Sequence, residues 1–108
     1  MIYTVTTIVD LEKGFDTGRT LSCRTVGYFH SLDDAMKALD ANYGNMYEDG
    51  WYPHAVIEEV EEGLYPCNDT KYWYTWYDAT QKYLPSVMPD QVRAMYKNHE
   101  IMNFHEIG

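Results

Sequence analysis

Basic residues are scarce in this chain of 108 residues. It contains 17 Asp and Glu residues but only 8 Lys and Arg residues, so its formal net charge is −9 with neutral histidines. Nucleic acids and anionic membranes are bound through clustered Lys and Arg side chains. We therefore expect no direct contact with nucleic acid or membrane. The charge favours solubility and leaves basic proteins and cationic ligands open as partners.

Cysteines and long apolar runs are also scarce. The chain has two cysteines, Cys23 and Cys67, and no apolar run approaches the length of about 18 residues that indicates a membrane helix. The opening segment "MIYTVTTIVD" has no basic stretch and alternates polar with apolar residues, which is not the pattern of a signal peptide. These features predict a cytoplasmic protein with reduced thiols.

No pattern of residues indicates catalysis or metal binding. The pairs His99–Glu100 and His105–Glu106 lie six positions apart. That is neither the spacing of a helical zinc-protease motif nor that of a zinc finger. Cysteine and histidine have no local arrangement typical of a nucleophile and its base. We therefore expect no enzyme activity, no catalytic residue, no metal site and no cofactor.

The order of the predicted elements indicates an α+β fold. Strands are predicted at residues 2–9, 20–29, 55–60, 71–78 and 82–87, helices at 31–43 and 89–98, and a closing strand at 101–107. We expect an antiparallel sheet of about five or six strands, with one main helix and one short helix on one face, in two layers. The length predicts a single domain over residues 1–108.

The segment "SLDDAMKALDANY" carries the clearest helix pattern. Ser31 is a suitable N-cap, and Asp33 and Asp34 follow in the first turn, where acids suit the helix dipole. Apolar residues then recur along one stripe, typical of a helix that packs on a core. Gly44 is expected to end this helix.

The segment "KYWYTWYD" predicts a strand that is aromatic on both faces. Alternation places Tyr72, Tyr74 and Trp76 on one face, with Trp73 and Tyr77 on the other. A strand with one face in water normally alternates apolar and polar residues. We therefore expect both faces to be covered, one by the helices and the other by a loop of the same chain, a second subunit or a ligand.

Three interpretations of these rings stay open at this point. They can pack on one another and on Tyr83 across the predicted hairpin, since cross-strand aromatic pairs stabilise small sheets. They can form a protein interface, including a homo-oligomeric one, where Tyr and Trp are enriched. They can also form a platform on which a ligand stacks.

The middle of the chain is strongly acidic. Residues 38–70 contain eight acids and no Lys or Arg. Four of these acids stand together at the end of a predicted strand, namely Glu58, Glu59, Glu61 and Glu62. One interpretation is a negative patch that steers a basic partner or imitates nucleic-acid phosphates. The other is a solvated strand end whose charges discourage pairing of sheet edges.

Three segments resemble a known group of proteins. They are "AVIEEVEEGLYP" at 55–66, "WYTWYD" at 73–78 and "NFHEIG" at 103–108. They are similar to short uncharacterised proteins of gut Firmicutes and their phages, and the resemblance runs from residue 24 to the C-terminus. It implies no known activity. It does imply a phage context, in which short acidic proteins often bind and inhibit a component of the host.

These patterns together predict a non-catalytic binding protein that occludes a protein partner, with a host defence system as one target. Two alternatives remain: sequestration of a small nucleotide-like ligand on an aromatic face, and a homo-oligomeric accessory domain. The residues expected at the site are Tyr72, Trp73, Tyr74, Trp76 and Tyr77 as anchors, and Glu58, Glu61 and Glu62 as steering charges.

Overall fold

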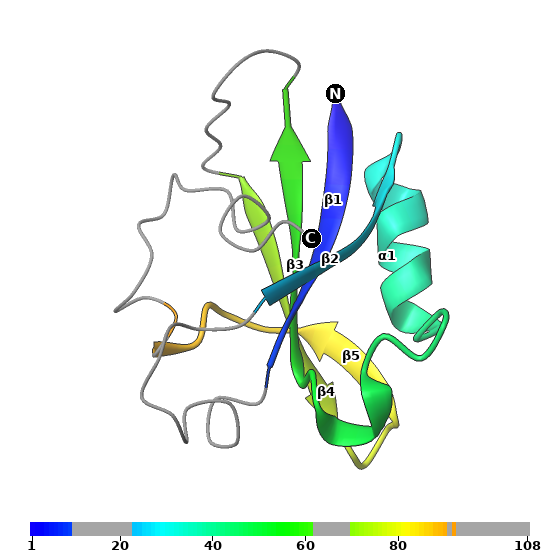
Figure 1. The fold of residues 1–108 in the computed structure, drawn as a ribbon, viewed down its shortest axis with the longest axis vertical. Coiled ribbons are helices and arrows are strands. Elements are labelled where there is room, and N and C mark those ends of the chain that lie inside the picture. Colours follow the sequence, from blue (N-terminus) through cyan, green and yellow to red (C-terminus); the bar gives the residue numbers. More distant parts are fainter. Residues whose placement is uncertain (10–22, 62–69, 91, 93–108) are drawn as a thin grey trace.

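The described part of the chain forms a five-stranded antiparallel sheet with one α-helix. The computed structural model describes residues 1–9, 23–61, 70–90 and 92. The elements are β1 (Ile2–Ile8), β2 (Cys23–Phe29), α1 (Leu32–Asp40), a short 3-10 helix η1 (Glu48–Gly50), β3 (His54–Val60), β4 (Lys71–Tyr77) and β5 (Lys82–Pro85). The strand order is β2-β1-β3-β4-β5, so β2 and β5 are the edges (Figure 1).

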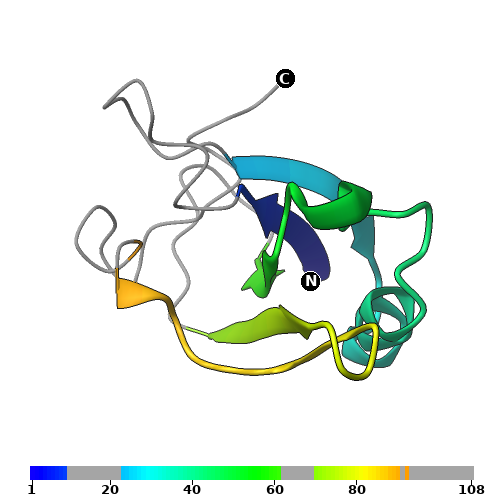
Figure 2. The ribbon, with the colours of Figure 1, turned by 90° about the horizontal axis from the view of Figure 1, so that it is seen from below.

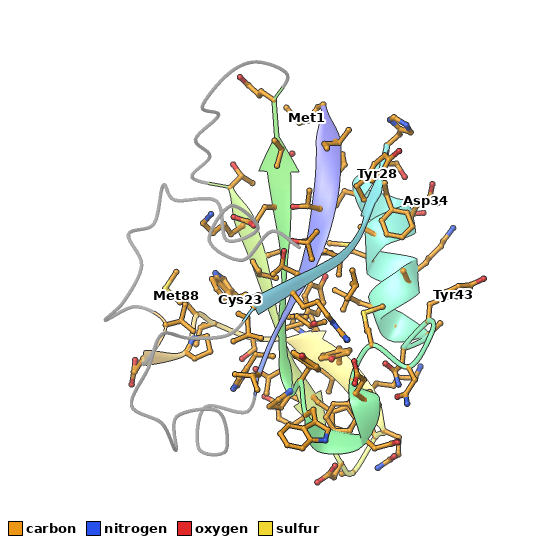
Figure 3. All side chains as sticks on the ribbon, viewed as in Figure 1. Met1, Cys23, Tyr28, Asp34, Tyr43 and Met88 are labelled. Atoms are coloured by element: carbon orange, nitrogen blue, oxygen red, sulfur yellow. The ribbon has the colours of Figure 1, made fainter. Side chains whose placement is uncertain are left out.

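Both faces of the sheet carry a buried apolar cluster. The helix-side cluster contains Val5, Ala35, Leu39, Met46, Ala55, Ile57, Tyr74 and Tyr83. The far-side cluster contains Ile8, Val9, Cys23, Val56, Met88 and Val92, with Tyr52 and Trp73 packed against it. Figure 2 shows the sheet from below as a curved layer with α1 on one side, and in Figure 3 Cys23 and Met88 lie away from α1. The expectation that both faces are covered is confirmed for the described residues.

Helix α1 begins as its sequence predicts and ends earlier. The Ser31 side chain accepts a hydrogen bond from the backbone N–H of Asp34, and Ala35 and Leu39 are buried against the sheet. The predicted helix runs to residue 43, whereas α1 ends at Asp40. The reason lies at Asn42, which adopts a left-handed backbone with φ 47° and cannot continue a right-handed helix.

Strand β2 forms an irregular edge. Its pairing with β1 shifts between Val5 and Thr6, so Val26 is the extra residue of a β-bulge. A bulge interrupts the regular row of backbone groups that a second chain would need for pairing along this edge. The β2 edge is therefore poorly suited to joining two sheets.

The other predicted strands agree with the structure within a few residues. Strands β3, β4 and β5 correspond to the predicted 55–60, 71–78 and 82–87, although β3 begins at His54, β4 ends at Tyr77 and β5 ends at Pro85. The predicted helix at 89–98, apart from residues 89, 90 and 92, and the closing strand at 101–107 lie outside the described residues. Among the residues that are described, no helix has the length and apolar character needed to span a membrane.

Helix α1 should stabilise the fold mainly through the side chains that it packs on the sheet. We expect Leu39→Ala to lower the free energy of unfolding by about 2–5 kcal/mol, because it opens a cavity in the helix-side cluster. The matched control is Tyr43→Ala just beyond the helix, where the side chain is 78% exposed and points away from the molecule (Figure 3). Urea unfolding of both variants measures the difference, and equal destabilisation would contradict this packing.

Candidate functional site

The aromatic strand β4 contributes to the core on both sides of the sheet. Tyr74 is buried in the helix-side cluster, and Tyr72 and Trp76 are half-buried at the margin of that cluster. Trp73 is half-buried against the far-side cluster, and Tyr77 is exposed at the end of the strand. The predicted grouping by face is confirmed for Tyr72, Tyr74 and Trp76 on one side and for Trp73 on the other. Each face of β4 borders a cluster from the same chain, and Tyr72, Trp73 and Trp76 stay partly exposed at the margins of these clusters.

The Trp76 indole is covered by rings from two other segments. Tyr47 stacks on it with ring centroids 3.9 Å apart and an interplanar angle of 9°. Tyr83, its partner in the β4–β5 register, meets it edge to face at 5.3 Å. We call Tyr47, Trp76 and Tyr83 the aromatic triad. Packing on Tyr83 is one of the three interpretations left open by the sequence. The contact with Tyr47 was not predicted, since Tyr47 lies in a turn segment with no periodic pattern.

Tyr83 is the most deeply placed hydroxyl of the triad. Its side chain donates a hydrogen bond of 2.6 Å to the backbone carbonyl of Tyr52. Burial raises its pKa, the neighbouring Tyr47 raises it further, and Arg24 partly opposes the shift. Burial likewise raises the pKa of Tyr74. Both phenols therefore stay neutral in the folded protein at pH values where a free tyrosine ionises.

Stability should fall in alkaline solution because of these phenols. Below the ordinary tyrosine pKa of 10.0, the Tyr83 phenol is protonated in both the folded and the unfolded chain, so the free energy of unfolding does not depend on its ionisation. Above it the unfolded chain ionises first, so the free energy of unfolding decreases as pH rises. We expect Tyr83→Phe to cost about 1 kcal/mol at neutral pH, through loss of the Tyr52 hydrogen bond, and to flatten the alkaline decrease.

The measurement is urea unfolding as a function of pH, with Tyr43→Phe as the control for removal of an exposed hydroxyl. An alkaline decrease that is equally steep in Tyr83→Phe and in the unmodified protein would show that Tyr83 does not cause it.

Glu58 lies in the core and not in a solvated patch, which corrects the sequence-based expectation. It faces Lys71 directly across the β3–β4 pair, and Lys71 Nζ donates to Glu58 Oε2 at 2.5 Å. The Glu58 side chain is 0% exposed and the Lys71 side chain is 5% exposed. Thr4 lies beside Glu58 in the β1–β3 register, and its buried Oγ1 has no hydrogen-bond partner within the described part of the chain. Three strands thus place a polar row on the far side of the sheet.

Breaking this ion pair should destabilise the fold more than replacing it. We expect Glu58→Gln to lower the free energy of unfolding by about 3–5 kcal/mol, because the Lys71 ammonium is left buried without its carboxylate. Exchanging both residues for apolar ones, as in Glu58→Leu with Lys71→Met, should recover most of that loss. Chemical unfolding of the single and double variants tests this, and additive losses would refute it.

The remaining charges leave a surplus of carboxylates at the surface. Within the described residues all four Lys and Arg side chains form ion pairs, namely Arg24–Glu48, Lys37–Asp33, Lys71–Glu58 and Lys82–Asp40. The acidic segment 38–70 is therefore partly neutralised by residues from outside it. Asp34, Asp49, Glu59, Glu61 and Asp78 form no ion pair with a described Lys or Arg. Glu61 is exposed, and Glu62 lies outside the described residues.

A groove opens beside β4 at the point where β5 ends. It has a volume of about 410 Å³, and we call it the β4 groove. Its lining residues are Met36, Lys71, Tyr72, Trp73, Tyr74, Pro85, Ser86, Val87 and Met88. The β4–β5 register ends at Tyr74 and Pro85, and the backbone N–H of Ser86 donates to the carbonyl of Trp73. The groove thus follows the stretch of β4 that extends past its neighbour.

Two further hollows lie near α1. One, of about 530 Å³, runs between β2 and residues 43–48, and the Arg24–Glu48 ion pair lies in its wall. The other, of about 490 Å³, lies against α1, and Tyr43 lines both. Neither contains a residue of β4. Of these three hollows, the β4 groove is the one that gathers predicted site residues, namely Tyr72, Trp73 and Tyr74.

The structure divides the predicted site into separate places. Tyr72, Trp73 and Tyr74 share the β4 groove with Lys71, and Trp76 belongs to the aromatic triad. Within the residues that can be described, no group of three or more His, Cys, Asp or Glu side chains is arranged to hold a metal ion. No protein-family model matches the chain, and searches of curated proteins and of solved structures gave no significant match.

Proposed function

We propose that this chain is a non-catalytic binding protein that occludes a surface of a protein partner through the β4 groove. The observation that supports it is the lining of that groove. Tyr72 and Trp73 approach it from opposite faces of the sheet, and Val87, which is 73% exposed, stands at its rim. Large aromatic side chains in a desolvated pocket are the usual anchors of protein interfaces. The expected occupant is an extended segment with a large apolar side chain.

The surface charge favours a basic partner. The net charge is −9, and the described Lys and Arg side chains are already engaged by carboxylates. Glu61 and Asp34 are exposed and form no such ion pair. Long-range attraction to Lys and Arg speeds encounter and orients the complex, and it weakens as salt is added. The segment that enters the groove is therefore flanked by basic residues.

The sequence resemblance adds a biological setting to this proposal. In that setting the protein is encoded by a phage of gut Firmicutes and acts in the host cytoplasm. The partner is then a component of a host defence system, which is blocked by occupation of its surface and not by chemical modification.

A second candidate function is capture of a small molecule in the same groove. The observation that favours it is Lys71, whose largely buried ammonium side chain lines the groove together with aromatic rings. Apolar pockets with a few placed polar groups are typical ligand sites. Native mass spectrometry of gently purified protein separates the candidates. A reproducible added mass of metabolite size supports small-molecule capture, and unliganded protein supports a protein partner. A dimer would favour the homo-oligomeric alternative.

A positive charge placed at the groove rim should weaken binding to the partner, because it must be desolvated and it repels the partner's basic residues. A display library of random linear peptides serves as the probe, and we expect the protein to select peptides with an aromatic or large aliphatic residue beside Lys or Arg. Val87→Lys should weaken binding of the selected peptides by about tenfold or more, which corresponds to about 1.4 kcal/mol. Val26→Lys, at an exposed position of β2, is the matched control. Equal binding to both variants would place the contact elsewhere.

A further inference from the structure

Trp76 lies next to a carboxylate that has no basic partner among the described residues. Its indole Nε1 donates to Asp78 Oδ1 at 3.2 Å, which holds the carboxylate beside the edge of the ring. Asp78 is exposed in the turn that follows β4, and it forms no ion pair with a described Lys or Arg. An aromatic face beside a carboxylate is the combination that attracts a cationic group.

The segment that covers Trp76 has an unusual backbone. We call residues 42–51 the strap. Six of its residues have left-handed φ angles, namely Asn42, Gly44, Asn45, Glu48, Asp49 and Gly50. This conformation suits glycine and asparagine but costs about 1–2 kcal/mol for a residue such as Glu48. Local preference thus favours the strap at its glycines and asparagines, whereas at Glu48 contacts must hold the backbone in place.

The contacts of the strap differ on the two sides of Tyr47. On one side Met46 is buried, and its carbonyl accepts from Arg24. On the other side Glu48 forms the ion pair with Arg24. These contacts hold the backbone. The Tyr47 ring itself stacks on the indole and also meets Tyr83 edge to face at 6.2 Å. Rotation of the Tyr47 side chain would exchange these ring contacts for an uncovered indole face, while the backbone contacts of the strap remain.

We propose that the indole face of Trp76 is a binding site for an arginine side chain of a partner protein, which replaces the Tyr47 ring and pairs with Asp78. Tryptophan is the strongest aromatic partner for a cation, and the planar guanidinium group stacks on a ring while it hydrogen-bonds a carboxylate. An anionic ring such as a nucleotide would meet repulsion from Asp78. Trp76, Asp78 and Tyr47 do not line the β4 groove, so the arginine site can be tested independently of the proposed function.

The test uses two short capped peptides that differ at one position, Gly-Arg-Gly and its neutral citrulline counterpart. Nuclear magnetic resonance of the isotope-labelled protein follows the indole N–H of Trp76, assigned with Trp76→Phe. We expect the arginine peptide to shift this signal, with binding that weakens as salt is added, and the citrulline peptide to bind several-fold more weakly. Equal binding of both peptides, or an unmoved indole signal, overturns the proposal.

Three variants separate the parts of the site. Tyr47→Ala should tighten arginine binding by about twofold to tenfold, because the ligand no longer competes with a stacked ring. Tyr43→Ala, an exposed ring on the same strap, should leave the affinity unchanged. Asp78→Asn keeps a hydrogen-bond acceptor for the indole, removes the charge and should weaken binding several-fold. If Tyr47→Ala perturbs folding, Tyr47→Leu replaces it. Unchanged affinity in Asp78→Asn, or no gain in the Tyr47 variants, contradicts the proposal.

Discussion

The pairing of β3 with β4 is the constraint on which the described structure depends. Its register sets Ala55 and Ile57 opposite Tyr74 and Tyr72 on the helix side, and it sets Glu58 opposite Lys71 on the far side. A shift of one residue would send every side chain of β4 to the other face and leave both buried charges without their partners. Ring burial and charge pairing thus favour the same register, so each supports the other.

The sequence predicted this sheet well because the strand pattern has a period of two. Alternation alone assigned the five rings of β4 to their faces and indicated that neither face is left in water. It also located α1 through Ser31 and the apolar stripe. The end of α1 was less predictable, because Gly44 and Asn42 both favour a left-handed backbone, and local preference does not decide which one ends the helix.

The site was less predictable, because its decisive contacts join distant segments. Glu58 belongs to an acidic run, and only its partner across the sheet, 13 positions along the chain, shows it to be a core residue. Tyr47 is one aromatic residue in a turn, and its stacking on Trp76 follows from the path of the strap. The β4 groove exists because the antiparallel partner β5 ends at Pro85, opposite Tyr74, and does not extend along the first residues of β4. Residue patterns do not specify such a difference in strand length.

The ion pair of Glu58 and Lys71 also restricts how this sequence can change over generations. A change at either position alone produces a chain with one buried charge, whereas a joint change to apolar residues removes both charges together. Evolutionary paths that alter one position first therefore cross a poorly folded intermediate. Among descendants of this chain, the two positions should vary as a pair, even though neither needs to contact a partner.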